Sequence, residues 1–161
     1  MIEKFCIWLE SQPFAVAISQ SSWLFPSIET VHVLALTMVV GSIAMVDLRL
    51  LNWAYRDRAV KQLTNEVLPW TWTAFVVAAI FGALLFASAA TKYYGIATFR
   101  AKMVLMVLAG VNMMFFHFVP YRRADEWGAG IQTTPLAKTC GALSLLLWTG
   151  IVAFGRWTGF A

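Results

Sequence analysis

Four long apolar stretches dominate this chain of 161 residues. We expect membrane spans at approximately 26–52, 69–90, 99–120 and 135–160. A helix needs about 20 apolar residues to cross the hydrocarbon core of a bilayer. Because lipid offers the backbone no hydrogen-bond partner, each stretch should be helical. The sequence therefore predicts an all-α membrane protein, a four-transmembrane-helix bundle that forms a single integral membrane domain over residues 1–161.

The composition excludes an ordinary soluble domain and argues against a nucleic-acid-binding protein. Hydrophobic residues make up 60% of the chain and charged residues 12%, whereas a soluble domain has about 45–50% and about 25%. The net charge of +4 comes without a run of Lys and Arg, so it suits an anionic membrane surface better than nucleic acid. The two cysteines, Cys6 and Cys140, form no metal or redox motif, and we expect them to be packing residues.

The N-terminal residues and the basic residues indicate how the bundle sits in a membrane. Residues 2–10 place Phe5 and Trp8 on one helical face, which predicts a short interfacial helix. Seven of the twelve Lys and Arg residues lie within 49–61 and 122–138, around the first and third loops. Since cytoplasmic loops carry the excess of basic residues, we expect periplasmic termini in a bacterial inner membrane.

Both histidines of the chain fall inside predicted spans, His32 near the start of the first and His117 near the end of the third. An ionisable residue in a membrane usually marks a site, and neutral imidazole is a common ligand of haem iron, zinc and copper. The alternative is a structural histidine bonded to a helix carbonyl. The first and third spans run the same way, so the two histidines should lie at opposite depths. This favours two separate sites, or one metal site and one structural histidine.

Further ionisable residues share the expected level of His32. Glu29 precedes it by three residues and lies on the same helix face, where it could orient the imidazole ring. Arg100, Lys102 and Arg156 lie on the same side of the membrane, and three cations suit an anionic group such as the propionates of haem. Ordinary extension of long side chains towards the headgroups is the alternative.

Other polar and small residues have simpler interpretations. Asp47 and Arg49 are expected to form an interfacial ion pair, and Asn112 is expected to hydrogen-bond across helices. Small residues at helical spacing predict close helix contacts, in the pairs Ala78 with Gly82 and Gly155 with Gly159.

Two segments resemble a known family. The stretch TVHVLALTMVVGSIAMVDLRLLN (30–52) resembles the first haem-ligating helix of the HemJ-type protoporphyrinogen IX oxidases and their CopD-like relatives. The stretch FRAKMVLMVLAGVNMMFFHF (99–118) resembles their later helix, which begins with a lysine and ends near a histidine. The resemblance implies that His32 is an axial ligand of haem b and that Lys102 is a functional lysine beside it.

The whole chain also resembles an uncharacterised family of small bacterial four-helix inner-membrane proteins. The resemblance is carried by ETVH (29–32), DLRLLN (47–52), LPWTW (68–72), AGVNMMFFH (109–117) and GRWTGF (155–160). It spans nearly the full length and implies no known activity.

Three functions follow as hypotheses. The first is a haem b-binding membrane protein that transfers electrons, with a quinone or another redox partner, and with membrane oxidoreductase activity left open. A symmetric dimer that donates His32 twice to one haem is one form of it. The second is a copper-handling protein in which His32 and methionines are soft ligands. The third is a non-catalytic structural or accessory subunit, homo-oligomeric or docked to a larger complex. His117 is either a second metal ligand or structural.

Overall fold

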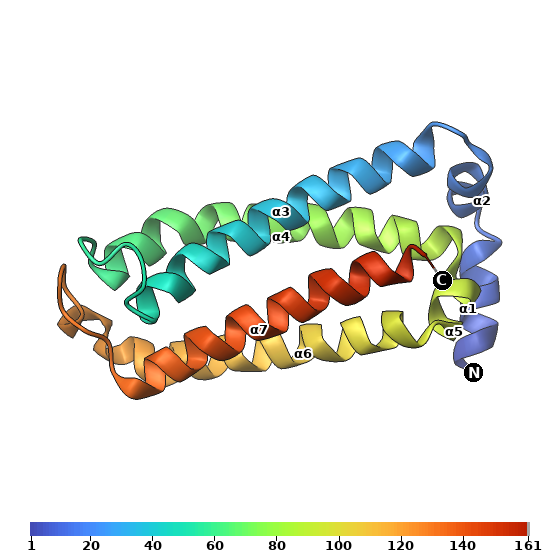
Figure 1. The fold of residues 1–161 in the computed structure, drawn as a ribbon. Helices are drawn as coiled ribbons and strands as arrows, with labels where there is room; N and C mark the ends of the chain where they lie inside the picture. Colours follow the sequence, from blue (N-terminus) through green and yellow to red (C-terminus); the bar gives the residue numbers. More distant parts are fainter. Residues whose placement is uncertain (161) are drawn as a thin grey trace.

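The computed structural model describes residues 1–160 and is built from helices joined by short connections (Figure 1). In chain order these are α1 (Ile2–Glu10), α2 (Pro13–Gln20), α3 (Leu24–Leu50), α4 (Val60–Ser88), α5 (Ala90–Gly95), α6 (Ala97–Phe118), the 3-10 helix η1 (Pro120–Glu126) and α7 (Pro135–Thr158). No strand occurs within these residues.

Four of the helices are long and apolar enough to cross a membrane. They are α3, α4, α6 and α7, with 27, 29, 22 and 24 residues. At the helical rise these lengths correspond to roughly 33–44 Å, which exceeds the hydrocarbon thickness of about 30 Å. The prediction of an all-α bundle with four transmembrane helices is confirmed.

The long helices form two antiparallel hairpins. Helix α3 packs along α4, α6 packs along α7, and α7 joins the hairpins by packing against α3 (Figure 1). Both chain termini lie at one end of the bundle, together with α1, α2 and α5. We call this the terminal end. The opposite end, the loop end, carries the connections 51–59 and 119–134.

Helix α4 begins at Val60, nine residues before Pro69, where we expected the second span to open. Its first turns are amphipathic, with Val60, Leu63 and Thr64 buried and Lys61 exposed. Pro69 lies inside the helix instead of starting it. Proline removes one backbone donor, and transmembrane helices tolerate this loss when neighbouring groups satisfy the freed backbone.

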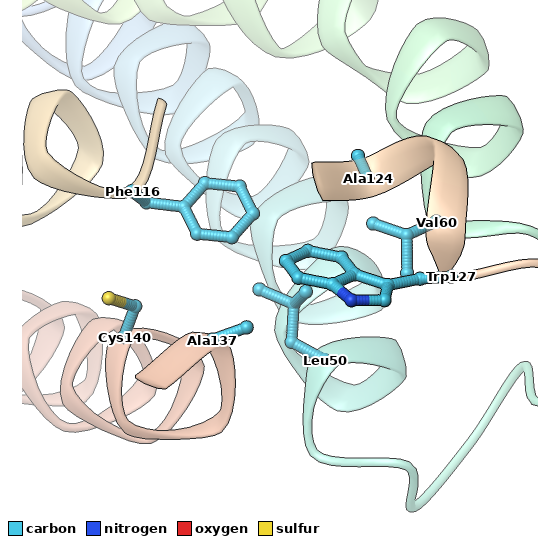
Figure 2. Packing of buried hydrophobic residues seen from close by; sticks show 7 residues of the cluster. All are labelled: Leu50, Val60, Phe116, Ala124, Trp127, Ala137 and Cys140. Carbon is cyan, nitrogen blue, oxygen red and sulfur yellow. The ribbon is translucent and has the colours of Figure 1, made fainter. Parts of the chain in front are cut away.

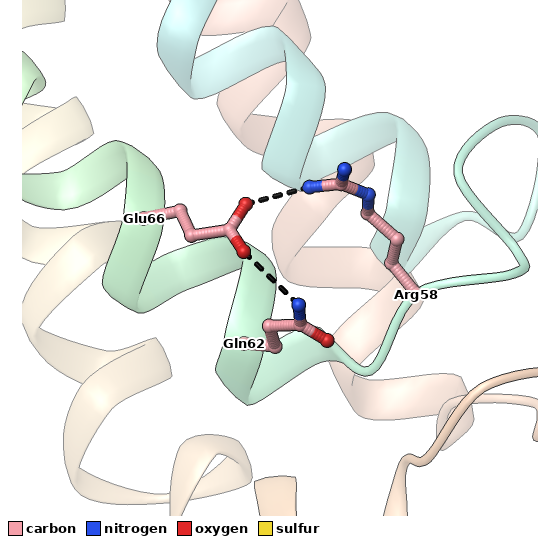
Figure 3. A network of polar contacts seen from close by, with 3 residues as sticks. All are labelled: Arg58, Gln62 and Glu66. Atoms are coloured by element: carbon pink, nitrogen blue, oxygen red, sulfur yellow. Dashed lines mark hydrogen bonds and ion pairs between the residues drawn. The ribbon is translucent and has the colours of Figure 1, made fainter.

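The exposed side of this extension carries a polar cluster (Figure 3). The guanidinium of Arg58 contacts the carboxylate of Glu66 at 2.6 Å, and the amide of Gln62 donates to the same carboxylate at 3.0 Å. Both charged side chains are about half exposed, at 46% and 47%. Water screens such pairs, so we expect this one to contribute about 0–1 kcal/mol.

Arg49 lies at the centre of the loop end and is 0% exposed. Its guanidinium donates to the backbone carbonyls of Arg58 (2.7 Å), Gly128 (2.9 Å) and Ile131 (3.2 Å), and to the side-chain oxygen of Asn52 (2.9 Å). One side chain of α3 thereby holds together the two loops that connect the hairpins' helices.

The expected ion pair between Asp47 and Arg49 was wrong. The ion pairs among the described residues join Arg58 to Glu66 and Lys61 to Asp125. Residues two apart on a helix point to different sides, so the carboxylate of Asp47 and the guanidinium of Arg49 turn away from each other.

An apolar cluster closes the loop end beside Arg49 (Figure 2). The indole of Trp127, which is 2% exposed, packs between residues from the helices and from η1. The cluster consists of Leu50, Val60, Phe116, Ala124, Trp127, Ala137 and Cys140. Cys140 and Cys6 are both buried and unbonded, which agrees with the packing role expected for them.

At Gly141, α7 approaches α3 closely. A Cβ atom at this position would lie 3.2 Å from the carbonyl oxygen of Asp47 and 3.2 Å from Cβ of Leu50. We predict that Gly141→Ala lowers the free energy of unfolding by about 1–3 kcal/mol, because the helices must move apart. SDS titration in mixed micelles measures this change. The control is Gly41→Ala, where a new Cβ meets nothing within 4 Å. Equal stability of the two variants would contradict the close approach.

The terminal end is covered by α1 and α2. Helix α1 occupies residues 2–10, where the interfacial helix was predicted, and exposes Phe5 and Trp8. Helix α2 follows directly and was not predicted. The carboxylate of Glu10 accepts hydrogen bonds from the backbone N–H of Thr91 (2.8 Å) and from its hydroxyl. This contact ties the N-terminal helices to the start of α5.

Candidate functional site

The imidazole of His32 is fixed against α4. Its Nδ1 lies 2.8 Å from the carbonyl oxygen of Ala78. A carbonyl oxygen only accepts hydrogen bonds, so Nδ1 carries the proton and Nε2 keeps its lone pair. This is the arrangement in which metal-ligating histidines are usually held, with one nitrogen on a carbonyl and the other towards the metal.

Gly82 makes room for this ring. A Cβ atom at position 82 would lie 2.7 Å from Cε1 of His32, closer than real Cβ contacts. The pair Ala78 and Gly82, predicted as a close helix contact, therefore has a specific role. Ala78 supplies the acceptor and Gly82 supplies the space. The α3–α4 contact and the orientation of His32 depend on each other.

Lys102 lies at the same end of the bundle, on α6. Its side chain packs over Gly155 of α7, where a Cβ atom would be 3.6 Å from Nζ. Among residues 1–160, no carboxylate forms an ion pair with Lys102. An ammonium group without a counter-ion in a membrane protein suits an anionic ligand.

The other residues proposed around His32 lie on the surface. Arg100 and Arg156 are exposed, and the guanidinium of Arg156 stacks 4.9 Å above the ring of Phe160. Glu29 is also exposed. His32 donates its orienting hydrogen bond to the carbonyl of Ala78 and not to Glu29.

Glu29 also lies near Tyr93 of α5. Burial raises the pKa of the Tyr93 phenol, and the negative charge of Glu29 raises it further. The structure therefore places His32 and Lys102 at the same end of the bundle, each against a glycine of a neighbouring helix, and leaves Arg100, Arg156 and Glu29 exposed.

His117 occupies a different environment at the loop end. Its ring lies against the ring of Tyr121, with 4.9 Å between centroids. Its Nδ1 atom is buried and has no hydrogen-bond partner among residues 1–160. His117 lies beside a cavity that Asp47 and Thr64 also line, whereas His32 contacts the far part of α4. The histidines are thus at opposite ends, in agreement with the depth argument from sequence.

That cavity has a volume of about 220 Å³ and lies between the four long helices, in the half towards the loop end. Its wall includes Asn112, whose amide donates to the carbonyl of Cys140 across the α6–α7 contact at 3.0 Å. The predicted cross-helix bond of Asn112 is confirmed. Sequence reasoning missed the cavity, because Thr64 lay outside the predicted second span and Asp47 was assigned an ion pair.

The described residues contain no group of three or more His, Cys, Asp or Glu side chains that could hold a metal ion. A metal at His32 would therefore have to bring its remaining ligands with it, as the porphyrin of a haem does.

Comparison with known families identifies the family to which the chain belongs. A family model described as a family of unknown function (DUF6644) matches residues 23–161. The chain belongs to this family. In this DUF6644 member the match includes all four long helices, whereas α1 and α2 precede it. No curated protein and no solved structure matches the chain. Nothing in these comparisons links it to the HemJ or CopD proteins that two of its helices resemble.

Proposed function

We propose that this protein binds haem b at the terminal end of the bundle, with His32 as an axial ligand, and that it transfers electrons in the membrane. The main support for this proposal is the hydrogen bond from Nδ1 of His32 to the carbonyl of Ala78. It fixes the ring plane and leaves Nε2 available, which is what an iron ligand requires.

The donor set at this end suits the group. Nε2 of His32 would bind the iron, and Lys102 would neutralise one propionate from within the bundle. Arg100 and Arg156 are placed at the exposed rim, where long side chains meet carboxylates at the membrane surface. Bound haem supplies one-electron chemistry. The chain's own contribution is to orient the imidazole of His32 through Ala78 and to leave space for it at Gly82. It also supplies the positive charge of Lys102 at the same end of the bundle.

A structural or accessory subunit is the second candidate, and the same contact favours it. The bond to Ala78 satisfies one nitrogen of His32 without any metal. A copper site has less support, because His32 would need soft partners. Four of the methionines considered for this role are exposed, namely Met38, Met103, Met113 and Met114.

We further propose that the bundle lies in a bacterial inner membrane with periplasmic termini. The two ends of the chain lie at the same end of the bundle (Figure 1), and the basic residues of the opposite, loop end favour the cytoplasmic side for the loop end. The haem would then lie towards the periplasm.

Absorbance spectra of the protein, purified in mild detergent after growth with added haem precursor, test the main proposal. We expect a Soret band and a reduced α-band in the wild type and in His117→Ala, and neither band in His32→Ala. Lys102→Met should retain less haem than Lys92→Met, its exposed control at the same end. Wild-type protein without haem would overturn the cytochrome proposal and leave the structural subunit.

A further inference from the structure

Among residues 1–160, three buried side-chain polar atoms lack hydrogen-bond partners, and all three belong to residues that line one cavity. They are Oδ2 of Asp47, Oγ1 of Thr64 and Nδ1 of His117. Asp47 is 5% exposed and Thr64 is 3% exposed. Leaving buried polar groups unpaired is costly, and most such groups in native proteins have a partner. A shared cavity indicates that the partner is a molecule which enters it.

The three atoms come from different helices. Asp47 lies on α3, Thr64 on α4 and His117 on α6, all near the loop end of their helices. Together they offer a carboxyl group, a hydroxyl group and an imidazole nitrogen. These groups include donors and acceptors, so they can hydrogen-bond either a carbonyl group or a hydroxyl group of a ligand.

The rest of the cavity wall is mostly apolar, and the hydroxyls of Ser42 and Thr71 within it are bonded to each other. Towards the middle of the bundle it is lined by Val39, Phe75, Met106 and Trp148. An occupant therefore needs a polar head at the loop end and an apolar body directed to the membrane centre. Ligand sites are typically built in this way, with a few convergent polar groups in an apolar wall.

The size of the cavity limits the occupant to one ring. A protein cavity of about 150 Å³ accepts benzene, and drug-sized ligands need about 300 Å³ or more. The volume of about 220 Å³ lies between these values. A single six-membered ring with oxygen substituents fits the volume, and the aromatic side chains of Phe75 and Trp148 offer it stacking surfaces.

The cavity can be entered from the side. Helices α4 and α6 face each other across it, each packed mainly on its own hairpin partner. Three of the lining residues, Trp72 of α4 and Gly110 and Met113 of α6, are also exposed on the outer surface of the bundle. In a membrane this surface faces lipid, so a lipophilic molecule can reach the cavity without passing through water.

We propose that this cavity binds the head group of a membrane quinone or quinol, with its oxygen atoms at Asp47, Thr64 and His117 and its isoprenoid tail leaving between α4 and α6. The site is separate from His32 and Lys102, neither of which lines the cavity. The quinone proposal can therefore be tested independently of the haem proposal.

Gly110 and Gly41 provide a matched pair of variants to test this. Both are exposed glycines within long helices, and a Cβ added at either meets nothing within 4 Å. Gly110 lines the cavity and Gly41 does not. Leucine at either position should be accepted by the fold, but Gly110→Leu places its side chain at the entrance.

The experiment measures binding of ubiquinone-1 to the detergent-purified protein by isothermal titration calorimetry. We expect saturable binding to the wild type and to Gly41→Leu, and at least tenfold weaker binding to Gly110→Leu. Thr64→Val keeps the shape of the side chain and removes the hydroxyl, so it should weaken binding by up to about tenfold. Thr73→Val, an exposed threonine outside the cavity wall, should have no effect.

Two outcomes would overturn the proposal. Absence of saturable binding to the wild type would mean that the three polar atoms are satisfied by ordered water only. Equal affinities of Gly110→Leu and Gly41→Leu would place any bound quinone elsewhere. His32→Ala should bind ubiquinone-1 as the wild type does, so failure of the haem proposal leaves this result readable.

Discussion

Replacing Arg49 with methionine is expected to lower the free energy of unfolding by about 3–5 kcal/mol. The change leaves four acceptors at the loop end without their donor, namely three backbone carbonyls and the side-chain oxygen of Asn52. A buried acceptor that loses its partner costs about 1–3 kcal/mol, and some of these acceptors will regain water. SDS titration in mixed micelles, followed by helical circular dichroism, measures the loss.

Arg58→Met is the matched control for Arg49→Met. It removes the same kind of side chain from an exposed ion pair with Glu66 and leaves intact the backbone carbonyl that Arg49 contacts. We expect a change below about 1 kcal/mol. Arg49→Lys should recover only part of the stability, because an ammonium group lacks the fork of donors that reaches both loops. If the Arg49 and Arg58 variants were equally stable, Arg49 would not hold the loops together.

Gly82→Ala is expected to be destabilising and to displace His32. The new Cβ would lie 2.7 Å from Cε1 of the ring, so the ring must rotate away and give up its bond to Ala78. Loss of that bond costs about 1–3 kcal/mol, even though alanine is the better helix former by about 0.5–1 kcal/mol. Under the haem proposal the variant also loses the Soret band, because Nε2 no longer points where it did.

A double-mutant cycle separates this effect from a general packing defect. In a His32→Ala background the ring is absent, so Gly82→Ala should be neutral or slightly stabilising. The resulting coupling energy should be about 1–3 kcal/mol. Gly41→Ala serves as the control, with no coupling to His32, since a Cβ there meets nothing within 4 Å. A coupling near zero between positions 82 and 32 would falsify the ring placement.

The functional proposals for the two ends of the bundle can be tested independently. His32 and Lys102 at the terminal end are tested by haem content, and the cavity at the loop end is tested by quinone binding. A protein that binds both haem and quinone has two sites between which electrons can be transferred, at opposite depths of the membrane. A protein that binds only quinone would use the bundle as a lipophile-binding scaffold, with His32 as a structural contact between α3 and α4.

The sequence by itself determined the four membrane-spanning helices and the depth of the histidines. Lipid requires every backbone group to be paired within its own helix, so four apolar stretches of sufficient length could form little else. The order of residues along each span then fixed how far His32 and His117 lie from each end. The same local logic found the close pair Ala78 and Gly82 and the cross-helix bond of Asn112.

Only the tertiary structure decided which groups meet. The hydrogen-bond partner of His32 is 46 residues away along the chain, and the partners of Arg49 lie in two loops. The expected pair of Asp47 and Arg49 failed for the same reason, because closeness in sequence does not bring side chains two residues apart to one helix face. Unpaired atoms of Asp47, Thr64 and His117 become a site only when three helices surround one cavity. Membrane insertion acts on each segment separately, whereas packing between segments depends on the shapes of all four.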